Sequence, residues 1–251
     1  MPITVATWNV NGIRARQEQV QVFLEEHRPD VLCLQEIKAA PEQLPVWITS
    51  VDGYVSQWHG AKGYSGVALL TKRELCGPGP CFVSPDFDFE HRILTIDLPQ
   101  ATVASVYVPN GGKDYDAKLR FLTGLRGLAA SHAASGRPLL ICGDLNVAHF
   151  DIDVHPKERK AGAIGQREDE RALFADLLAQ GLTDIQRHLH PGVPDLYTWW
   201  PPWRQMRERN IGWRIDYILA STDLAARAQQ CAAYREFGTS DHGPVVATFE
   251  V

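Results

Sequence analysis

Short apolar runs alternate along this chain with longer segments whose apolar residues recur at helical spacing. The apolar runs are too short to span a membrane, and their flanking turn residues are typical of buried strands. The longer segments have the periodicity of helices that cover one face of a sheet. We expect strands at 3–8, 30–36, 64–71, 91–98, 102–108, 138–142, 213–220 and 244–251, and helices at 15–28, 115–134 and 167–180.

No feature of the sequence divides the chain into separate units. No long linker, low-complexity tract or repeat interrupts the 251 residues, and the CGPGPC stretch at 76–81 is typical of a turn. Many strands with few helices between them favour two packed sheets with helices outside. We therefore expect one α/β domain over residues 1–251.

Charge and cysteine content limit the classes of protein that fit. The net charge is −5, so the chain lacks the overall basic excess of a general electrostatic DNA binder, although a local basic face fits within an acidic total. The five cysteines form no CxxC pair or other zinc spacing, which indicates reduced, mostly buried thiols in a cytoplasmic protein. The MPITVATWNV start lacks the basic and apolar regions of a signal peptide, and we expect no membrane partner.

Polar side chains follow the ends of most of the expected strands. If these ends converge, carboxylates and an imidazole share one cleft. Crowded carboxylates repel one another unless a cation joins them, and oxygen ligands suit Mg²⁺, with Mn²⁺ as a possible substitute. Such an ion could clamp a phosphate and stabilise its developing charge. The residues that would meet in this cleft are Glu36, Asp144, Asp216, Asp241 and His242.

Each of these residues also has an ordinary structural explanation. An Asp or Asn after a strand is a common turn former, Glu36 fits a solvated loop, and His242 fits a capping or packing role. Asp216 is harder to explain in this way, because it lies inside an apolar strand and an inward carboxylate requires a partner. The shared position at strand ends favours a common site.

Six sequence blocks occur in order along the chain: TWNVNG (7–12), LQEIK (34–38), YVPNGG (107–112), GDLNVAH (143–149), GWRIDYIL (212–219) and SDHGPV (240–245). The chain is similar, from end to end, to exonuclease III-type apurinic/apyrimidinic endonucleases of the endonuclease/exonuclease/phosphatase (DNase I-like) superfamily. The resemblance implies a four-layer α/β/β/α sandwich of two mixed sheets flanked by helices.

The same resemblance implies an activity and its surroundings. It implies Mg²⁺-dependent cleavage 5′ to abasic sites in duplex DNA, with 3′→5′ exonuclease and 3′-phosphodiesterase or 3′-phosphatase activity, in base excision repair. The expected partner is double-stranded DNA with abasic sites or 3′ ends. We expect a cytoplasmic monomer, associated with the nucleoid if the source is bacterial.

The resemblance also implies which residues bind the metal ion. Glu36 would be the main carboxylate ligand, assisted by Asn9 and Asp241. The expected metal group is completed by Asp144, Asn146 and His242.

Five residues have implied catalytic roles. Asp144 would orient or deprotonate the attacking water, and Asn146 would hold that water in line. The Asp-x-Asn spacing in an extended segment places both side chains on the same side. His242 would bind a non-bridging phosphate oxygen, while Asp216 pairs with it and raises its pKa. Tyr107 would donate a hydrogen bond to the phosphate or to the leaving oxygen.

The WWPPWRQMRERNIGW segment at 199–213 combines tryptophans with arginines. A core-packing segment is one explanation, which we favour for Trp200, but aromatic side chains beside cations also suit the minor groove and a flipped-out sugar. In the family, the position of Trp213 lines the sugar pocket and that of Trp199 packs on the abasic sugar, and we expect Trp203 and Met206 to form a wedge. The full set of DNA-binding candidates is Asn11, Lys38, Asn110, Lys113, Lys160, Trp199, Trp203, Arg204, Met206, Arg207 and Trp213.

Two features depart from the family pattern and leave other functions open. The basic 155–167 loop lacks the asparagines common there, and Lys113 stands where some relatives have Arg, which changes the geometry of phosphate contacts. The chain could therefore be mainly a 3′→5′ exonuclease with weak abasic incision. A phosphoesterase acting on a non-DNA phosphate and a catalytically inactive DNA-binding module are further alternatives.

Overall fold

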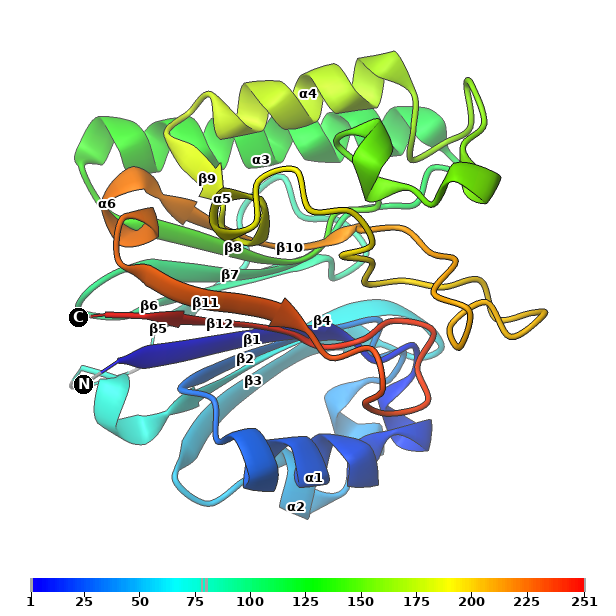
Figure 1. The fold of residues 1–251 in the computed structure, drawn as a ribbon. Coiled ribbons are helices and arrows are strands. Elements are labelled where there is room, and N and C mark those ends of the chain that lie inside the picture. The colour runs from blue at the N-terminus through cyan, green and yellow to red at the C-terminus, as the bar shows by residue number, and fades with distance from the viewer. Residues whose placement is uncertain (1, 78, 80, 251) are drawn as a thin grey trace.

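Two six-stranded sheets pack face to face in the computed structural model, which describes residues 2–77, 79 and 81–250 (Figure 1). The strand orders are β11–β12–β1–β2–β4–β3 and β5–β6–β7–β8–β10–β9, and each sheet mixes parallel with antiparallel pairs. The first sheet contains β1 (Ile3–Asn9), β2 (Val31–Gln35), β3 (Tyr54–Ala61), β4 (Tyr64–Lys72), β11 (Ala228–Ala233) and β12 (Val245–Phe249). The second contains β5 (Cys81–Val83), β6 (Ile93–Asp97), β7 (Thr102–Tyr107), β8 (Leu139–Asp144), β9 (Leu182–Asp184) and β10 (Asp216–Ser221).

Helices cover the outer faces of both sheets, so the expected α/β/β/α sandwich is confirmed (Figure 1). The long helix α3 begins where the Asp114 carboxylate accepts a hydrogen bond from the Ala117 amide and ends at Gly136 in the left-handed conformation, φ 68°. The helices are α1 (Gln17–His27), α2 (Val46–Thr49), α3 (Tyr115–Ser135), α4 (Glu168–Leu178), α5 (Ile185–Leu189) and α6 (Thr222–Ala225), with 3₁₀ turns at Ile13–Ala15, Pro41–Gln43, Arg73–Leu75, Asp151–Asp153 and Pro156–Glu158.

The core is divided into layers that explain the apolar runs of the sequence. Cys33 and Cys142 lie in the layer between the two sheets, Phe23 packs between α1 and the first sheet, and Phe121 and Phe174 pack between the second sheet and α3 with α4. The central strands therefore have both faces covered, which selects continuous apolar stretches rather than strict alternation. The five cysteines are free thiols, three of them buried.

The strand directions bring the polar strand ends to one edge. β1 runs parallel to β2, and β7 runs parallel to β8 with Tyr107 beside Asp144. β10 runs antiparallel to β8, so its first residue, Asp216, lies opposite Asp144. β12 is antiparallel to β1, which places the 240–244 segment near the end of β1. We call this edge, at the right of Figure 1, the active-site edge.

Several elements were not predicted from the sequence. Strands β3, β5, β9 and β11 and the short helices α2, α5 and α6 were not expected, and the strand expected at 213–220 begins only at Asp216. β3 and β11 lie at sheet edges, where most side chains are partly or fully exposed and the apolar pattern is weak. Part of the expected turn at 76–81 lies outside the described residues. Within the described part of the chain, no helix has the length and apolarity that crossing a bilayer requires.

Candidate active site

A carboxylate pair and an imidazole meet at the active-site edge. Ligand atoms of Glu36, Asp144 and His242 lie within 4.8 Å of one another. Asn9, the last residue of β1, donates through Nδ2 to Glu36 Oε1 and to Asp144 Oδ2, both at 2.9 Å. Asn9 therefore ties the two carboxylates together and also joins the first sheet to the second.

Close approach of the strands explains the glycine in the GDLN block. A Cβ on Gly143 would lie 1.9 Å from the Val106 carbonyl oxygen, so any other residue would push β8 away from β7. The next residue, Asp144, accepts the Asn146 amide at 2.9 Å, and Asn146 adopts a positive φ of 52°. Asn146 Nδ2 donates to the Val108 carbonyl at 2.9 Å and to Asp144 Oδ2 at 3.2 Å. The Asp-x-Asn pair thus ends the strand and also faces the site.

His242 is held by a buried aspartate. Its Nδ1 lies 2.9 Å from Asp216 Oδ2, and its Nε2 lies 3.9 Å from Asp144 Oδ2. Thr198 donates to Asp216 Oδ2 at 2.6 Å and accepts the Ile215 and Asp216 amides, which fixes the carboxylate. Burial lowers the pKa of His242, but the charge and hydrogen bond of Asp216 outweigh it and raise the pKa to about 10.

The two carboxylates of this cluster, Glu36 and Asp144, have opposite pKa shifts. Burial raises the pKa of Asp144 to about 8; the charge of His242 opposes this shift, and those of Asp216 and Glu36 add to it. Burial also acts to raise the pKa of Glu36, but hydrogen bonds from Asn9 and Lys38 outweigh it and leave the pKa below its usual value. One carboxyl group is therefore inclined to hold a proton while its neighbour stays ionised.

Tyr107 completes the polar end of β7. Its side chain is buried, and the guanidinium of Arg92 lies over its ring at 4.8 Å from the centroid. Burial raises the pKa of Tyr107 well above its usual value, and the charges of Glu36 and Asp144 add to this shift. The phenol therefore stays protonated at neutral pH and can donate a hydrogen bond.

Asp241 lies beside this group but has other partners. Its Oδ1 accepts Asn11 Nδ2 at 2.8 Å, and its Oδ2 accepts Trp199 Nε1 at 3.0 Å. Lys38 Nζ in turn donates to Asn11 Oδ1 at 2.5 Å and lies 2.7 Å from Glu36 Oε2. The structure therefore places Asp241 outside the three-residue cluster, where it orients Asn11 and Trp199.

Trp199 and Trp213 form an aromatic pair next to His242. Their rings meet edge to face with centroids 5.7 Å apart, and Trp199 lies 6.4 Å from the imidazole. Gly165 packs against Trp213, where a Cβ would lie 2.7 Å from Cζ3. This brings the turn before α4 against the tryptophan pair.

The structure disagrees with the expected position of Met206, and it gives Arg207 an internal role. Met206 is buried in a small cluster with Tyr197, Trp200 and Ile211, so it is not an exposed wedge. Arg207 donates to the carbonyls of Arg235, Phe237 and Ser240, and so holds the loop that leads to His242. The backbone of 201–210 is neither helix nor strand, so helical or strand periodicity could not predict which of its side chains are buried.

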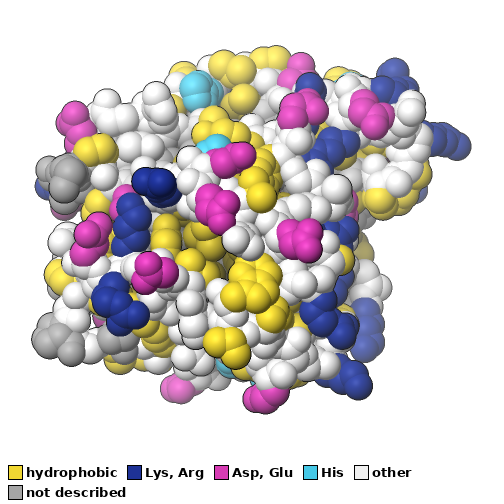
Figure 2. All heavy atoms as spheres, turned by 90° about the horizontal axis from the view of Figure 1, so that it is seen from below, with side chains coloured by type: hydrophobic (Ala, Val, Ile, Leu, Met, Phe, Trp, Pro, Cys, Tyr) yellow, Lys and Arg dark blue, Asp and Glu magenta, His cyan; other side chains and the backbone are white. Residues whose placement is uncertain are grey.

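The remaining DNA-binding candidates lie on the surface around the site. Trp203 is 55% exposed, and the loop that carries it projects from the active-site edge (Figure 1). Lys and Arg side chains gather at the right-hand edge of Figure 2, which corresponds to the active-site edge in Figure 1. A basic edge is therefore present on a chain of net charge −5. The other exposed candidates are Asn110, Lys113, Lys160 and Arg204.

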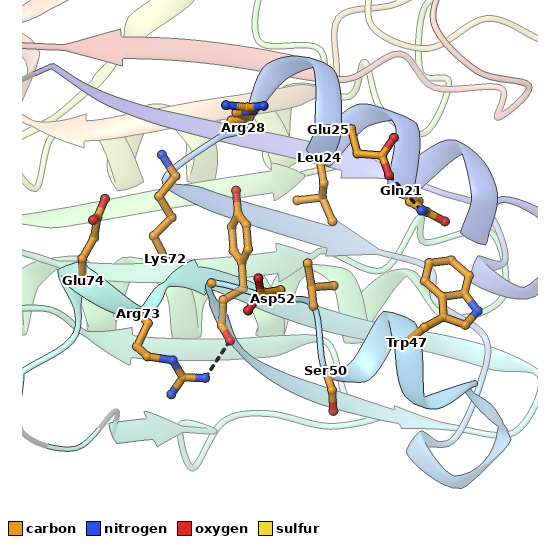
Figure 3. A pocket seen from close by; sticks show the side chains of 13 residues that line it. Gln21, Leu24, Glu25, Arg28, Trp47, Ser50, Asp52, Lys72, Arg73 and Glu74 are labelled. Carbon is orange, nitrogen blue, oxygen red and sulfur yellow. Dashed lines mark hydrogen bonds between the residues drawn. The ribbon is translucent and has the colours of Figure 1, made fainter.

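A separate hollow on the α1–α2 side has no comparable chemistry. It lies between α1 and the β3–β4 hairpin, and Trp47, Arg28 and Glu25 are among its lining residues (Figure 3). Its size makes it prominent, but its acidic and basic side chains are mixed. Among the described residues, the only group of three or more metal-ligating side chains close enough to hold an ion is the Glu36–Asp144–His242 cluster.

The donor set at the active-site edge fits a hard metal ion. Two crowded carboxylates, one with a raised pKa, would be relieved by a cation between them. Asp216 Oδ1 is buried and has no hydrogen-bond partner among the described residues, so this region also has unused acceptor capacity. Asn9 presents its amide nitrogen to the carboxylates, which makes it a tether between them rather than an oxygen ligand in this arrangement.

Two supporting residues were not indicated by the sequence pattern. Thr198 orients Asp216, and Arg92 packs on Tyr107. A threonine before a tryptophan-rich segment has no distinctive signal of its own. Arg92 precedes an apolar strand, a position where an arginine is usually exposed, so nothing in the sequence indicated that its side chain is buried.

Comparisons with known proteins agree with this geometry. A family model described as "Endonuclease/Exonuclease/phosphatase family" matches residues 6–242. An exodeoxyribonuclease from Bacillus subtilis is 34% identical over 251 residues, covering 95% of this chain and 96% of the relative. An AP endonuclease structure from Archaeoglobus fulgidus has a TM-score of 0.89 at 33% identity, covering 99% and 100% of the two chains. The structure of the 3′ phosphatase NExo from Neisseria bound to a product DNA hairpin has a TM-score of 0.90 at 30% identity, with the same coverage. The chain therefore belongs to the endonuclease/exonuclease/phosphatase family.

Proposed function

We propose that this protein is a Mg²⁺-dependent DNA-repair nuclease that cleaves the phosphodiester bond 5′ to abasic sites in duplex DNA. The observation that carries the proposal is the position of the Trp199–Trp213 pair next to His242. An aromatic pair beside a phosphate-cleaving group suits a sugar that has lost its base and can leave the helix. The names of the relatives, an AP endonuclease and an exodeoxyribonuclease, support the same reaction class.

In this proposal the catalytic residues divide the chemistry among them. Glu36 and Asp144 would hold the metal ion, whose charge would stabilise negative charge developing on the phosphate. Asp144, ionised when a cation lies beside it, would accept a proton from the attacking water, which Asn146 would orient. His242, kept cationic by Asp216, would bind a non-bridging phosphate oxygen.

Other groups at the edge would complete the transition state and bind the DNA. The protonated phenol of Tyr107 would donate to the phosphate or the leaving oxygen. Lys38 and Asn11 lie beside Glu36 and would contact the backbone of the DNA. Trp203 would act as the groove wedge without Met206. The remaining proposed phosphate contacts are Asn110, Lys113, Lys160 and Arg204.

Duplex DNA is the proposed partner, and the proposed working unit is a monomer. The NExo structure with a DNA hairpin supports the choice of a nucleic acid partner. The basic edge of Figure 2 provides attraction to phosphates in spite of the overall negative charge. The slope of DNA affinity against salt concentration follows the number of phosphates that a protein neutralises. We therefore expect the cations of this edge, and not the net charge of the chain, to set how steeply DNA affinity falls with added salt.

The test is cleavage of a 5′-labelled duplex that carries one abasic analogue, compared with an undamaged duplex with a recessed 3′ end. Each substrate is incubated with Mg²⁺ and with EDTA. We expect metal-dependent incision at the analogue. Absence of incision on both duplexes, together with turnover of a small phosphoester, would overturn the proposal.

A second candidate function has some support. The basic 155–167 loop keeps Lys160 exposed but lacks the asparagines of the family pattern, and one relative is named an exodeoxyribonuclease. The same site would then act mainly on 3′ ends. A ladder from the 3′ end without incision at the analogue would favour this alternative.

A further inference from the structure

A buried ion pair joins the two helices that cover the second sheet. Lys118 in α3 and Glu170 in α4 are both 0% exposed, and Lys118 Nζ contacts Glu170 Oε2. Burial lowers the pKa of Lys118 and Glu170 opposes this, with a net downward shift. Burying two charges costs free energy that their mutual attraction often does not recover. The other hydrogen bonds of the two side chains therefore indicate why charged residues are present here.

Each member of the pair binds backbone from a loop at the active-site edge. Lys118 Nζ donates to the Asn146 carbonyl at 2.7 Å and lies 3.5 Å from the Asn110 carbonyl. Glu170 Oε1 accepts the amides of Gly165 and Arg167. The pair therefore connects the loop after β8, the turn after β7 and the turn before α4.

These loops carry two separate parts of the candidate active site. Asn146 contacts Asp144, and Gly165 packs against Trp213. The Ala148 amide also donates to the Gly165 carbonyl at 2.8 Å, so the two loops touch directly. A shift of the ion pair would move the water-orienting residue and the wall of the tryptophan pair together.

A purely structural tie between α3 and α4 explains the pair less well. Phe121 and Phe174 already pack these helices together, and Arg126 and Asp176 form a pair between them at the surface, 4.0 Å apart. Apolar residues usually stabilise such a contact as well as a buried ion pair does. The charges are explained by the backbone groups that they fix.

We propose that Lys118 and Glu170 are positioning residues. They fix the loop after β8, which carries Asn146, relative to the turn before α4, which carries Gly165, and so support the chemical step without touching the substrate. The proposal rests on the proposed nuclease function. Because the pair acts on the geometry of the loops, its loss should lower kcat more than it changes KM.

The main test is the double variant Lys118→Met/Glu170→Gln, which removes both charges but keeps an acceptor for the Gly165 and Arg167 amides. We expect a Tm near that of the wild type, a KM within about twofold, and a kcat at least about tenfold lower on abasic duplex. The control Arg126→Met breaks the surface pair between the same helices and should leave kcat unchanged. A double variant with wild-type kcat would overturn the proposal.

A second variant covers the case in which the double variant does not fold. Glu170→Gln alone leaves Lys118 and all the backbone acceptors in place but weakens the pair. We expect kcat to fall at least about threefold, with KM unchanged. Wild-type kcat in folded Glu170→Gln would then overturn the proposal.

Amide hydrogen exchange separates this proposal from the nuclease function. If the wild type cleaves neither DNA substrate, the proposed function fails, and exchange in the same variants still tests the positioning role. We expect at least about tenfold faster exchange in 144–149 and 163–167, with 121–135 unchanged. Wild-type protection in both segments would count against the positioning role whatever the activity.

Discussion

Asp144 and Asp216 lie directly opposite each other on β8 and β10, yet only Asp216 approaches His242 within hydrogen-bond distance. Two aspartates in one cross-strand pair therefore have different tasks. Asp216 stabilises the imidazolium, and Asp144 faces Glu36 across the site. Such separation of paired groups by their surroundings is how a site obtains an acid and a base at one pH.

Asp216→Asn should lower the pKa of His242 toward neutrality, because it removes the charge that outweighs burial. A folded-state pKa raised to about 10 gives stability that is fully present below the unfolded value of about 6.5 and is lost as pH rises through 10. We therefore expect the variant to be less stable than the wild type at pH 6, with the difference shrinking between about pH 6.5 and pH 10. The imidazole proton resonances, followed by NMR against pH, measure the pKa directly. An unchanged His242 titration would contradict the assignment.

Asp144→Asn should stabilise the metal-free protein while abolishing cleavage. Because burial raises the pKa of Asp144 to about 8, the folded state binds more protons than the unfolded state between about pH 4 and 8, so stability falls as pH rises through this range. Asn removes that loss, and at about 1.4 kcal/mol for each pKa unit we expect a gain of several kcal/mol in unfolding free energy, with a higher Tm, at pH 8 and little difference near pH 4. Thermal melts in EDTA at both pH values measure it. Asp52→Asn, on the exposed rim of the remote hollow, is the control.

Trp213→Ala should reduce the preference for abasic over intact DNA more than it reduces affinity for either. Its ring forms one wall of the aromatic pair beside His242, where only an extruded sugar would reach it. Competition binding of abasic and intact duplexes gives the ratio directly. Trp47→Ala removes a tryptophan that is 40% exposed in the remote hollow and should leave the ratio unchanged (Figure 3). Equal losses on both duplexes would mean that Trp213 only packs the core.

Met206→Ala and Trp203→Ala should have opposite consequences. Met206 is buried, so its truncation should cost about 2–4 kcal/mol of unfolding free energy with little change in DNA preference. Trp203 is exposed, so its truncation should cost less than about 0.5 kcal/mol and weaken DNA binding. Urea denaturation and duplex binding of the two variants make the comparison. A stable Met206→Ala variant with impaired binding would restore the wedge role of this residue.

The strand-end residues could be predicted because they interrupt apolar runs. Asn9 and Asp144 end mainly apolar strands, Glu36 follows one and Asp216 begins one. The sheet topology then brings them to one edge. A polar side chain at the end of an apolar strand usually either forms a turn or contributes to a functional site. The four-layer arrangement of sheets and helices was predicted from the resemblance of the ordered sequence blocks to a known family.

The 199–213 segment could not be predicted in the same way. Its backbone is irregular, with positive φ at Arg204 and Gln205, so no fixed period connects sequence position with burial. Met206 and Arg207 therefore turn inward while Trp203 turns outward. Thr198 was not predicted because its role depends on a contact with Asp216, eighteen positions away in the chain.

The hydrogen bond from Asn9 to Asp144 spans 135 positions of the chain and joins the two sheets. The site also requires the 240–242 segment, which carries His242. The Trp8 indole holds this segment by donating to the His242 carbonyl across 234 positions. Contacts of such high sequence separation form late in folding, since long loops must close first. A first sheet formed alone has Glu36 and His242 but lacks Asp144, and a second sheet formed alone has Asp144 and Asp216 but lacks Glu36 and the imidazole. The capacity to cut a nucleic acid thus arises only when the whole molecule has folded, and a nascent or partly unfolded copy is harmless to the strand that it touches.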